Sequence, residues 1–309
     1  MILITGGMGF IGLHTAKFFL DAGESVVISQ HSARREPEFL KDDFGKRVFV
    51  ESLDITNTYE LFEVMQKHKI DGIVNLVAPP VRGSTPTNDV RIYTVGLLNL
   101  LEAGRIFGVK RVGLASSTLV YGSLPSGPFQ EDDLLPIESK TQVEAFKKAT
   151  ETLGLHYGDR TGLDVITLRM GFIYGPLYYS MFNLPGRLSH LAARDEKYDF
   201  NDFEDDEYDW CHVKDCARAV QELMMPDSLP HRIYNIGGGT SVQNKDVLAA
   251  AKKLKPDLDL KLQPGLSPAG RANVAMDMSR MKQDIGFEPQ FDIERGLADY
   301  VAWLKNHPE

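Results

Sequence analysis

The feature that most constrains this chain is a glycine-rich turn at its N-terminal end. Residues 2–4 form a short apolar run typical of a buried strand, and from residue 10 to residue 20 apolar side chains recur with a helical period. Gly6, Gly9 and Gly12 lie between them. A tight turn needs glycine, and bare backbone lets a phosphate approach the amides at the helix start. The sequence therefore predicts a dinucleotide bound by its pyrophosphate; the alternative is a glycine turn without a ligand.

The rest of the chain alternates between strand and helix patterns. Strands are expected at residues 26–28, 47–50, 72–77, 111–115 and 165–168, and helices at 59–68, 88–107 and 139–157. This alternation predicts an α/β fold with a Rossmann-type doubly wound parallel sheet. Beyond residue 175 the alternation weakens. We therefore predict a dinucleotide-binding domain over residues 1–170, to which 205–240 returns, and a smaller C-terminal α/β substrate lobe over 171–204 and 241–309.

Composition argues against several classes of protein. The net charge of −9 argues against nucleic acid as a partner, and no apolar run approaches the roughly 20 residues of a membrane span. The first strand begins at residue 2, so we expect no signal peptide. Cys211 and Cys216 lack the neighbours of a metal site and are interpreted as buried thiols. A cytoplasmic protein without a metal is expected.

Further motifs follow the glycine turn in a fixed order. They are Leu53-Asp54-Ile55, the segment 96–103, Ala115-Ser116-Ser117-Thr118-Leu119-Val120-Tyr121-Gly122, Ser139-Lys140 with Glu144, and the segments 168–176, 209–215 and 234–237. Together they resemble the extended short-chain dehydrogenase/reductases, the NAD(P)-dependent nucleotide-sugar epimerase/dehydratase family. The resemblance covers nearly the whole chain.

The resemblance implies a nicotinamide cofactor. Asp54 and the Ile55 amide match the adenine-binding pair, and Gln30 replaces the acid that usually binds the ribose hydroxyls. Arg34 and Arg35 follow, which favours NADP slightly over NAD because arginine pairs with a 2′-phosphate; alternatively they lie in a solvated loop or contact the pyrophosphate of NAD. The predicted cofactor-binding residues are Gly6, Gly9, Phe10, Ile11, Gly12, Gln30, Arg34, Arg35, Asp54, Ile55, Leu76, Val77, Ala78, Ser116, Lys140 and Met170.

The same resemblance implies a catalytic serine, tyrosine and lysine, in which the tyrosine exchanges a proton while hydride moves to or from the nicotinamide. Ser117 and Lys140 match the serine and the lysine. The tyrosine position, four residues before Lys140, holds Pro136, and no tyrosine occurs between Gly122 and Tyr157. The catalytic set is therefore expected to be atypical.

Another group would have to move the proton. Tyr93 replaces a family asparagine and is one candidate; a tyrosine facing the core or a dimer partner is the alternative. The other candidates are Tyr121, Tyr174, Glu138, His212 and Lys140 itself, which would otherwise only hold the nicotinamide ribose. The family dehydratases carry an Asp-Glu pair where this chain has Thr118 and Leu119, so nucleotide-sugar 4,6-dehydration is disfavoured.

The substrate region also departs from the family. Tyr208 replaces an arginine that holds a diphosphate, and Phe172 replaces an asparagine. Residues 195–209 carry nine carboxylates against one lysine; these lie in a solvated loop or disfavour an anionic ligand. A neutral or cationic small molecule that is not a nucleotide sugar is therefore a possible substrate. The candidate substrate-binding residues are Thr118, Tyr121, Phe172, Arg187, Tyr208 and Arg271.

Family members commonly pair two long helices into a dimer interface, here residues 88–107 and 139–157. A homodimer is therefore expected, although Ile92, Val95, Leu98 and Ile106 would also suit an ordinary core.

The predicted function is an oxidoreductase or isomerase acting on a sugar-like or natural-product carbonyl or alcohol. The alternatives are a redox-silent NAD(P)-binding protein and a non-redox lyase or isomerase on the same scaffold.

Overall fold

The computed structural model describes residues 1–31, 34–79 and 83–307, which form two compact units. The first unit comprises Met1–Ser123, Pro136–Arg169 and Ala217–Tyr234, and the second comprises Leu124–Leu135, Met170–Cys216 and Asn235–Glu309. This division places residues 124–135, 170, 205–216 and 235–240 in the second unit, whereas the sequence assigned them to the dinucleotide-binding domain.

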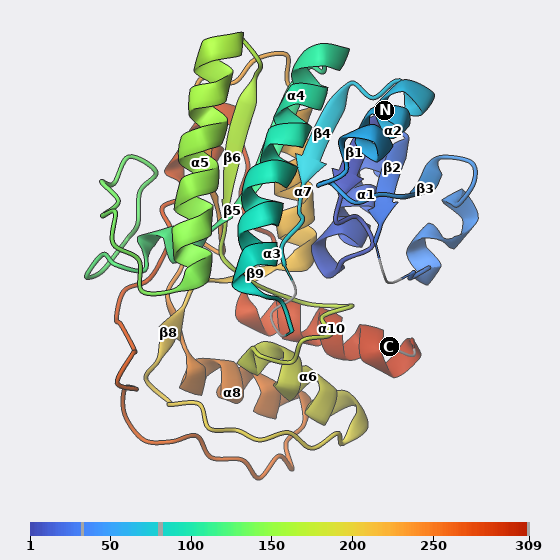
Figure 1. The fold of residues 1–309 in the computed structure, drawn as a ribbon. Helices are drawn as coiled ribbons and strands as arrows, with labels where there is room; N and C mark the ends of the chain where they lie inside the picture. The colour runs from blue at the N-terminus through green and yellow to red at the C-terminus, as the bar shows by residue number, and fades with distance from the viewer. Residues whose placement is uncertain (32–33, 80–82, 308–309) are drawn as a thin grey trace. The chain divides into compact units, whose positions relative to one another are not determined.

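A seven-stranded sheet forms the centre of the first unit (Figure 1). Its strands are β1 (Ile2–Thr5), β2 (Val26–Gln30), β3 (Val48–Ser52), β4 (Gly72–Asn75), β5 (Arg111–Ser117), β6 (Val165–Met170) and β10 (Ile233–Ile236). They lie in the order β10-β6-β5-β4-β1-β2-β3, and the pairs from β5 to β3 are parallel. The order reverses beside β1, which confirms the predicted doubly wound sheet.

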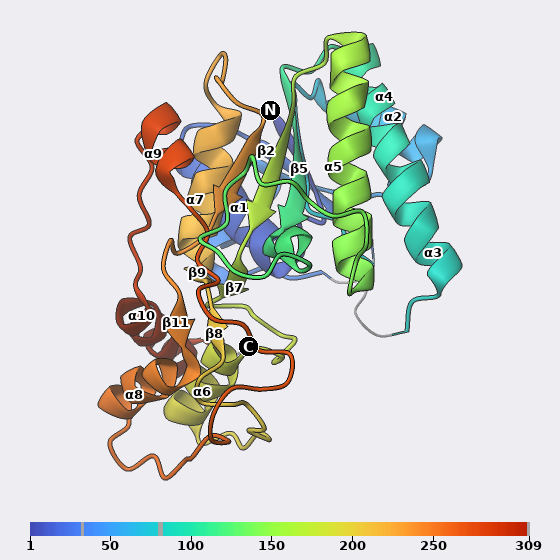
Figure 2. The ribbon, with the colours of Figure 1, turned by 90° about the vertical axis from the view of Figure 1, so that its left-hand side faces the viewer.

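Helices cover both faces of this sheet (Figure 2). They are α1 (Phe10–Asp21), α2 (Thr58–His68), α3 (Pro86–Arg91), α4 (Leu97–Phe107), α5 (Gln142–Thr161) and α7 (Val213–Met224), with short 3₁₀ turns at Glu38–Asp43 and Thr118–Tyr121. The helices α2, α4 and α5 lie on one face, and α1 and α7 on the other. Leu3, Val27, Ile73, Val112 and Val165 are buried in the core between the sheet and its helices.

The helix predicted over residues 88–107 is formed as three consecutive pieces. Between α3 and α4, residues Ile92–Gly96 adopt one turn of π-helix. A Cβ on Gly96 would lie 2.6 Å from Cδ1 of Ile55, so this turn packs closely against the segment that follows β3.

The helix α5 begins at Gln142, three residues later than the sequence predicted. Thr141 is its N-cap and accepts a hydrogen bond from the amide of Glu144 at 3.1 Å, while Glu144 accepts one from the amide of Lys140 at 2.8 Å. These bonds satisfy amides that have no partner inside a helix. Lys140 therefore precedes the helix, and Gly162 ends it in a left-handed conformation.

In its described residues, the second unit contains two small sheets and the helices that follow β7 along the chain. In it β7 (Phe172–Tyr174) pairs in parallel with β9 (Trp210–His212), and β8 (Glu207–Tyr208) pairs antiparallel with β11 (Val242–Gln243). Its helices are α6 (Leu184–Arg194), α8 (Asn244–Leu254), α9 (Ser279–Ile285) and α10 (Ile293–Asn306). Leu188, Trp210, Val247 and Leu297 belong to its buried core.

In the described part of the chain, no helix has the length and apolar character required to cross a bilayer. Cys211 and Cys216 are free thiols, and both are buried. Within the same residues no cluster of histidine, cysteine or carboxylate side chains is arranged to hold a metal ion.

Candidate functional site

The glycine turn between β1 and α1 has the geometry of an anion cradle. Gly6 has a φ of +71° and donates its amide to Oγ of Ser29 at 2.9 Å. Gly9 is the N-cap of α1 and makes no side-chain cap hydrogen bond to the amides at the helix start. A Cβ on Gly12 would lie 2.6 Å from the Gly6 carbonyl oxygen, and only glycine avoids this steric clash. These residues fit the pyrophosphate of a dinucleotide.

Gly7 is a further essential glycine that sequence reasoning did not single out. A Cβ at this position would lie 2.5 Å from Cβ of Ile28 on β2. The requirement comes from packing against a strand about twenty residues away in sequence. The only signal in the sequence was its place beside Gly6.

The two arginines after β2 have different surroundings. Arg35 donates from Nη1 to the carbonyl of Met8, at 3.0 Å, so its guanidinium lies against the glycine turn. Arg34 is exposed and pairs with Glu36 at 2.7 Å. Of the two predicted phosphate contacts, the structure therefore brings Arg35 to the turn and leaves Arg34 in a surface ion pair. Gln30 is the last residue of β2.

The predicted adenine contacts follow β3. The Asp54 carboxylate accepts hydrogen bonds from the amide and hydroxyl of Thr56, at 2.8 and 2.9 Å, and Ile55 is buried. Leu76, Val77 and Ala78 follow the carboxyl end of β4. In an open parallel sheet this edge is where ligands bind.

A buried polar cluster lies beneath the carboxyl end of β5. Glu151 of α5 accepts hydrogen bonds from Arg169 of β6, the shortest at 2.7 Å, and from the hydroxyl of Ser116. Arg169 also donates to the Tyr121 hydroxyl at 2.8 Å. Tyr121 is fully buried and Thr118 is 7% exposed. These two predicted substrate-binding residues therefore belong to the interior of the first unit.

Ser117 is the last residue of β5 and is less buried than this cluster. Its Oγ accepts a hydrogen bond from the amide of Leu119 at 3.2 Å, which leaves its hydroxyl hydrogen available to a ligand. Met170, the last residue of β6, is buried. Ser117 therefore lies at the edge where the predicted site is expected.

Lys140 does not have the surroundings expected of the family lysine. It is exposed and precedes α5. Lys147, the sixth residue of α5, is buried, and its Nζ donates to the carbonyl of Ala115 at 2.6 Å. Burial lowers the pKa of the Lys147 amine to about 8, against the opposing effect of Glu151. The structure thus brings Lys147, and not Lys140, to the end of β5.

Tyr93 lies beside this lysine. Its ring stacks on Phe146 with centroids 4.7 Å apart, and Nζ of Lys147 is 5.4 Å from its centroid. Burial, together with the charge of Asp89, raises the pKa of Tyr93 to about 12. A phenol with this pKa stays protonated at neutral pH, so Tyr93 is poorly suited to accept a proton.

The remaining candidates for proton transfer have other surroundings. Tyr174 is buried, and burial raises its pKa well above the usual value. His212 is fully buried and stacks on Phe291 with ring centroids 4.2 Å apart. Glu138 is exposed. Tyr174 and His212 are core residues of the second unit.

Phe172 and Tyr208 are brought together in the second unit. Their ring centroids are 4.9 Å apart, and each ring also contacts Trp210. Phe172 and Trp210 are register partners in the β7–β9 pair, which explains why the two rings are adjacent. Phe172 and Tyr208, the two residues that differ from the family pattern, therefore belong to a single aromatic cluster.

The two candidate anion-binding arginines already have partners in the same unit. Arg187 binds both carboxylate oxygens of Asp202, at 2.6 and 2.5 Å, and donates to the carbonyl of Phe182 at 2.8 Å. Arg271 donates to the carbonyl of Leu124 at 2.7 Å and lies over the ring of Phe129. An anion at either arginine would have to displace or share these contacts.

Much of the acidic segment 195–209 is tied to the structure of the second unit. Asp206 accepts from the amide of Ser267 at 2.8 Å, and Glu207 accepts from that of Asn273 at 2.7 Å. Asp209 is 1% exposed and accepts the amides of Gly238, Gly239 and Met276. Burial raises the pKa of Asp209 to about 6, although these amides oppose the shift. The segment is therefore more than a solvated loop.

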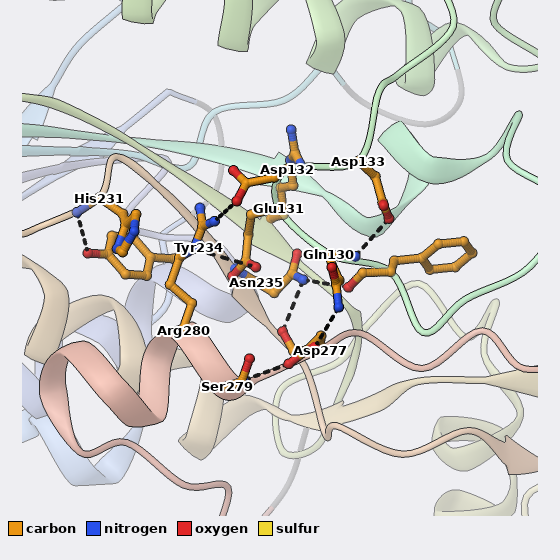
Figure 3. Close-up of polar contacts among 12 residues, drawn as sticks. Gln130, Glu131, Asp132, Asp133, His231, Tyr234, Asn235, Asp277, Ser279 and Arg280 are labelled. Carbon is orange, nitrogen blue, oxygen red and sulfur yellow. Dashed lines mark hydrogen bonds and ion pairs between the residues drawn. The ribbon is translucent and has the colours of Figure 1, made fainter.

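A further polar cluster fixes the loop around Glu131 (Figure 3). Glu131 accepts from the Asn235 amide at 2.9 Å, and the Asn235 side chain donates to the carbonyls of Phe129 and Asp277, at 2.9 and 3.1 Å. Arg280 pairs with Asp132 at 2.6 Å. Burial raises the pKa of Glu131. This cluster joins three segments distant in sequence and was not predicted.

The doubly wound sheet, the glycine turn and the serine at the end of β5 define a dinucleotide-binding enzyme of the extended short-chain dehydrogenase/reductase class. The NAD dependent epimerase/dehydratase family matches residues 2–237. The chain belongs to this family.

Several relatives resemble the chain over nearly its full length. Protein CapI of Staphylococcus aureus is 29% identical, with 98% of this chain and 97% of the relative covered. UDP-glucuronate 4-epimerase of Thermodesulfobacterium geofontis is also 29% identical, with 99% and 97% covered. The solved structure of MoeE5 in complex with UDP-glucuronic acid and NAD is 26% identical and superposes with a TM-score of 0.81, covering 98% of both chains.

Proposed function

We propose that this protein is an NAD(P)-dependent oxidoreductase or isomerase acting on a carbonyl or alcohol of a sugar-like or natural-product molecule. The observation that carries the proposal is the cradle formed by Gly6, Gly9 and Gly12, on the same sheet whose β5 ends at Ser117. The bound cofactor would supply a hydride acceptor or donor. NAD in the solved structure of MoeE5 supports the choice of cofactor.

Ser117 and Lys147 would act on the substrate and cofactor from the end of β5. The Ser117 hydroxyl would donate a hydrogen bond to the substrate oxygen, and Lys147 would take the ribose-holding role that the sequence assigned to Lys140. In support of this assignment, Lys147 precedes Glu151 by one helical turn, and Glu151 binds Arg169. The position four residues before Lys147 holds Val143, which carries no exchangeable proton.

A second candidate function is a redox-silent NAD(P)-binding protein or a non-redox lyase or isomerase. It is favoured because the candidate side chains are poorly suited to proton transfer. Pro136 and Val143 both lack a proton to exchange, and the phenol of Tyr93 has a pKa of about 12. Neither candidate function changes the predicted cofactor site.

The cofactor site is tested by isothermal titration calorimetry with NAD and NADP. We expect the wild-type protein to bind at least one of them with micromolar affinity. Gly9→Ala should weaken binding about tenfold, because a Cβ there would be 3.0 Å from the Gly6 carbonyl and would narrow the cradle. Gly108→Ala strains the left-handed C-cap of α4 (φ +66°) away from the cradle, so it controls for a loss of stability alone and should leave the affinity unchanged. Absence of binding to the wild type would refute the proposal.

Substitutions at Arg34 and Arg35 test whether the protein prefers NADP, which carries a 2′-phosphate, or NAD. Arg35→Glu should lower the affinity for NADP relative to NAD by about tenfold, because a carboxylate beside the glycine turn would repel the 2′-phosphate. Arg34→Glu, at an exposed residue in a surface pair, should change the ratio far less. Equal effects of the two changes on the NADP-to-NAD ratio would contradict a role for Arg35 in selecting the cofactor.

A homodimer through α4 and α5 is also proposed. Leu98 and Ile106 of α4 are 52% and 51% exposed, Val95 just before this helix is 42% exposed and Leu153 of α5 is 50% exposed, so these apolar side chains are not ordinary core. Ile92 packs against the core of the first unit. Light scattering should give twice the chain mass of 34.5 kDa. Leu98→Glu should yield a monomer, whereas Leu134→Glu, at a 91% exposed loop residue, should not. A monomeric wild type would rule the interface out.

A further inference from the structure

The amine of Lys147 is buried without a counter-ion in the described part of the chain. The residue is 7% exposed, and among the described residues Nζ has one hydrogen-bond acceptor, the carbonyl of Ala115 at 2.6 Å. Glu151, one helical turn later, is paired with Arg169 and forms no ion pair with this amine within the same residues. An ammonium group has three N–H donors, so the charged form would leave two of them without a protein acceptor. The surroundings therefore favour the neutral amine, whose lone pair can accept a proton.

The groups that face Lys147 come from β5, from the turn before α4 and from α5 itself. β5 presents the Ala115 carbonyl, and the turn presents the ring of Tyr93, whose centroid is 5.4 Å from Nζ. Asp89 lies one turn before Tyr93 and raises the pKa of that phenol. On α5, Glu151 opposes the effect of burial, which lowers the pKa of Lys147 to about 8. Both protonation states of this amine are therefore accessible near neutral pH.

The other side chains around this amine are poorly suited to exchange a proton. Val143, one helical turn earlier, is apolar and 40% exposed, so no phenol projects from that turn of α5. Burial raises the pKa of Tyr93 to about 12, and its phenol keeps its proton at neutral pH. Ser117, two residues after Ala115, has an alcohol hydroxyl that can donate a hydrogen bond to a substrate oxygen but is a weak base. An efficient general acid or base titrates near the working pH, and Lys147 is the group here that does so.

We propose that the Lys147 amine itself exchanges the proton with the hydroxyl of the substrate. When an alcohol is oxidised, its O–H proton passes to the lone pair of Nζ, its carbon-bound hydrogen leaves as a hydride to the nicotinamide, and a carbonyl remains. In the reverse direction the ammonium group returns a proton to the oxygen as the hydride comes back to carbon. The inference rests on the proposed function, because the proton step belongs to that reaction.

This role requires opposite protonation states of Lys147 with the oxidised and the reduced cofactor. The nicotinamide ring of the oxidised form is positively charged and disfavours an ammonium group nearby, whereas the ring of the reduced form is neutral. With a pKa of about 8 in the free protein, the amine must lose about nine-tenths of a proton on binding NAD at pH 7, and far less at pH 9. The affinity for NAD relative to NADH should therefore rise about tenfold from pH 7 to pH 9.

Calorimetric titration of the full-length protein at pH 7, 8 and 9 measures this ratio, with NAD and NADH or with NADP and NADPH, whichever pair binds more tightly. Titrations in two buffers of different ionisation enthalpy count the protons released. Lys147→Met should abolish both the rise and the proton release, and Lys140→Met, at an exposed residue before α5, should retain them. A constant ratio in the wild type, or a rise that persists in folded Lys147→Met, would overturn the inference.

Single-turnover formation of the reduced cofactor separates proton exchange from cofactor binding. The probes are glucose and the two ligands of the MoeE5 structures, UDP-glucose and UDP-glucuronic acid. Lys147→Arg keeps a cation that holds its proton in this pH range, so it should lower the rate at least a hundredfold at saturating cofactor. Thermal unfolding shows that the variant is folded, and Lys147→Met provides a second test. An undiminished rate in either variant would overturn the inference, whereas a wild type that binds no cofactor or reduces none with any probe would refute the proposed function beneath it.

Discussion

Replacement of Glu151 by alanine is expected to lower the free energy of unfolding by about 3–5 kcal/mol. Glu151 and Arg169 are buried, with side chains 6% and 3% exposed. Removing the carboxylate would leave the Arg169 guanidinium charged and without its main partner in the interior. Ser116 would lose its hydrogen bond as well. Urea unfolding followed by circular dichroism measures the loss.

The control for this prediction removes both charges. Glu151→Leu combined with Arg169→Met should recover most of the stability lost in Glu151→Ala, because the unpaired charge, and not the missing pair, accounts for most of the cost. A double variant that is less stable than the single one would contradict this explanation. Thr152→Ala, at an exposed residue next to Glu151 on the same helix, keeps this pair and is a useful comparison.

Replacement of Lys147 by methionine is expected to change both stability and cofactor binding. In the folded protein the pKa of Lys147 is about 8, below the ordinary lysine value of 10.5. The unfolded state therefore binds more protons between pH 8 and 10.5, so the wild type should gain stability as the pH rises through this window. Relative to Lys147→Met, the gain should reach about 3 kcal/mol.

The same variant should bind NAD about tenfold more weakly if Lys147 holds the nicotinamide ribose. Lys140→Met is the matched control, because Lys140 is exposed and outside the helix. Lys140→Met should leave the NAD affinity unchanged. Its free energy of unfolding should change with pH as that of the wild type does between pH 8 and 10.5. Equal effects of the two variants on NAD affinity would contradict the assignment of Lys147, and parallel stability curves would contradict its lowered pKa.

The sequence alone predicted the fold class and the place of the cofactor cradle. Both depend on local chemistry: the period of apolar residues selects strand or helix, and three glycines in a tight turn mark a close backbone approach. The seven-stranded sheet and the chain's membership in the epimerase/dehydratase family confirm the fold class, and the place of the cofactor cradle stays a prediction. The cofactor residues and the catalytic residues remain predictions.

The position of the lysine could not be decided from spacing. Ser139-Lys140 with Glu144 looked like the family motif, but Thr141 and Glu144 cap α5 and leave Lys140 before the helix. Lys147, which we propose for this role, could not be singled out because its environment comes from Ala115 and Tyr93, which lie far away in sequence. The signal that could have found it was Glu151, one turn later, with Arg169 on the next strand.

What the sequence determined by itself was where this chain turns, which segments become strands and helices, and which charged residues it contains. Tertiary structure alone decided which of those charges are available. Arg34 and Arg35 are neighbours in sequence, yet one pairs with Glu36 and the other reaches Met8. The physical reason is that a side chain's pKa and partners depend on burial and on residues distant along the chain, whereas turns and periods depend on immediate neighbours.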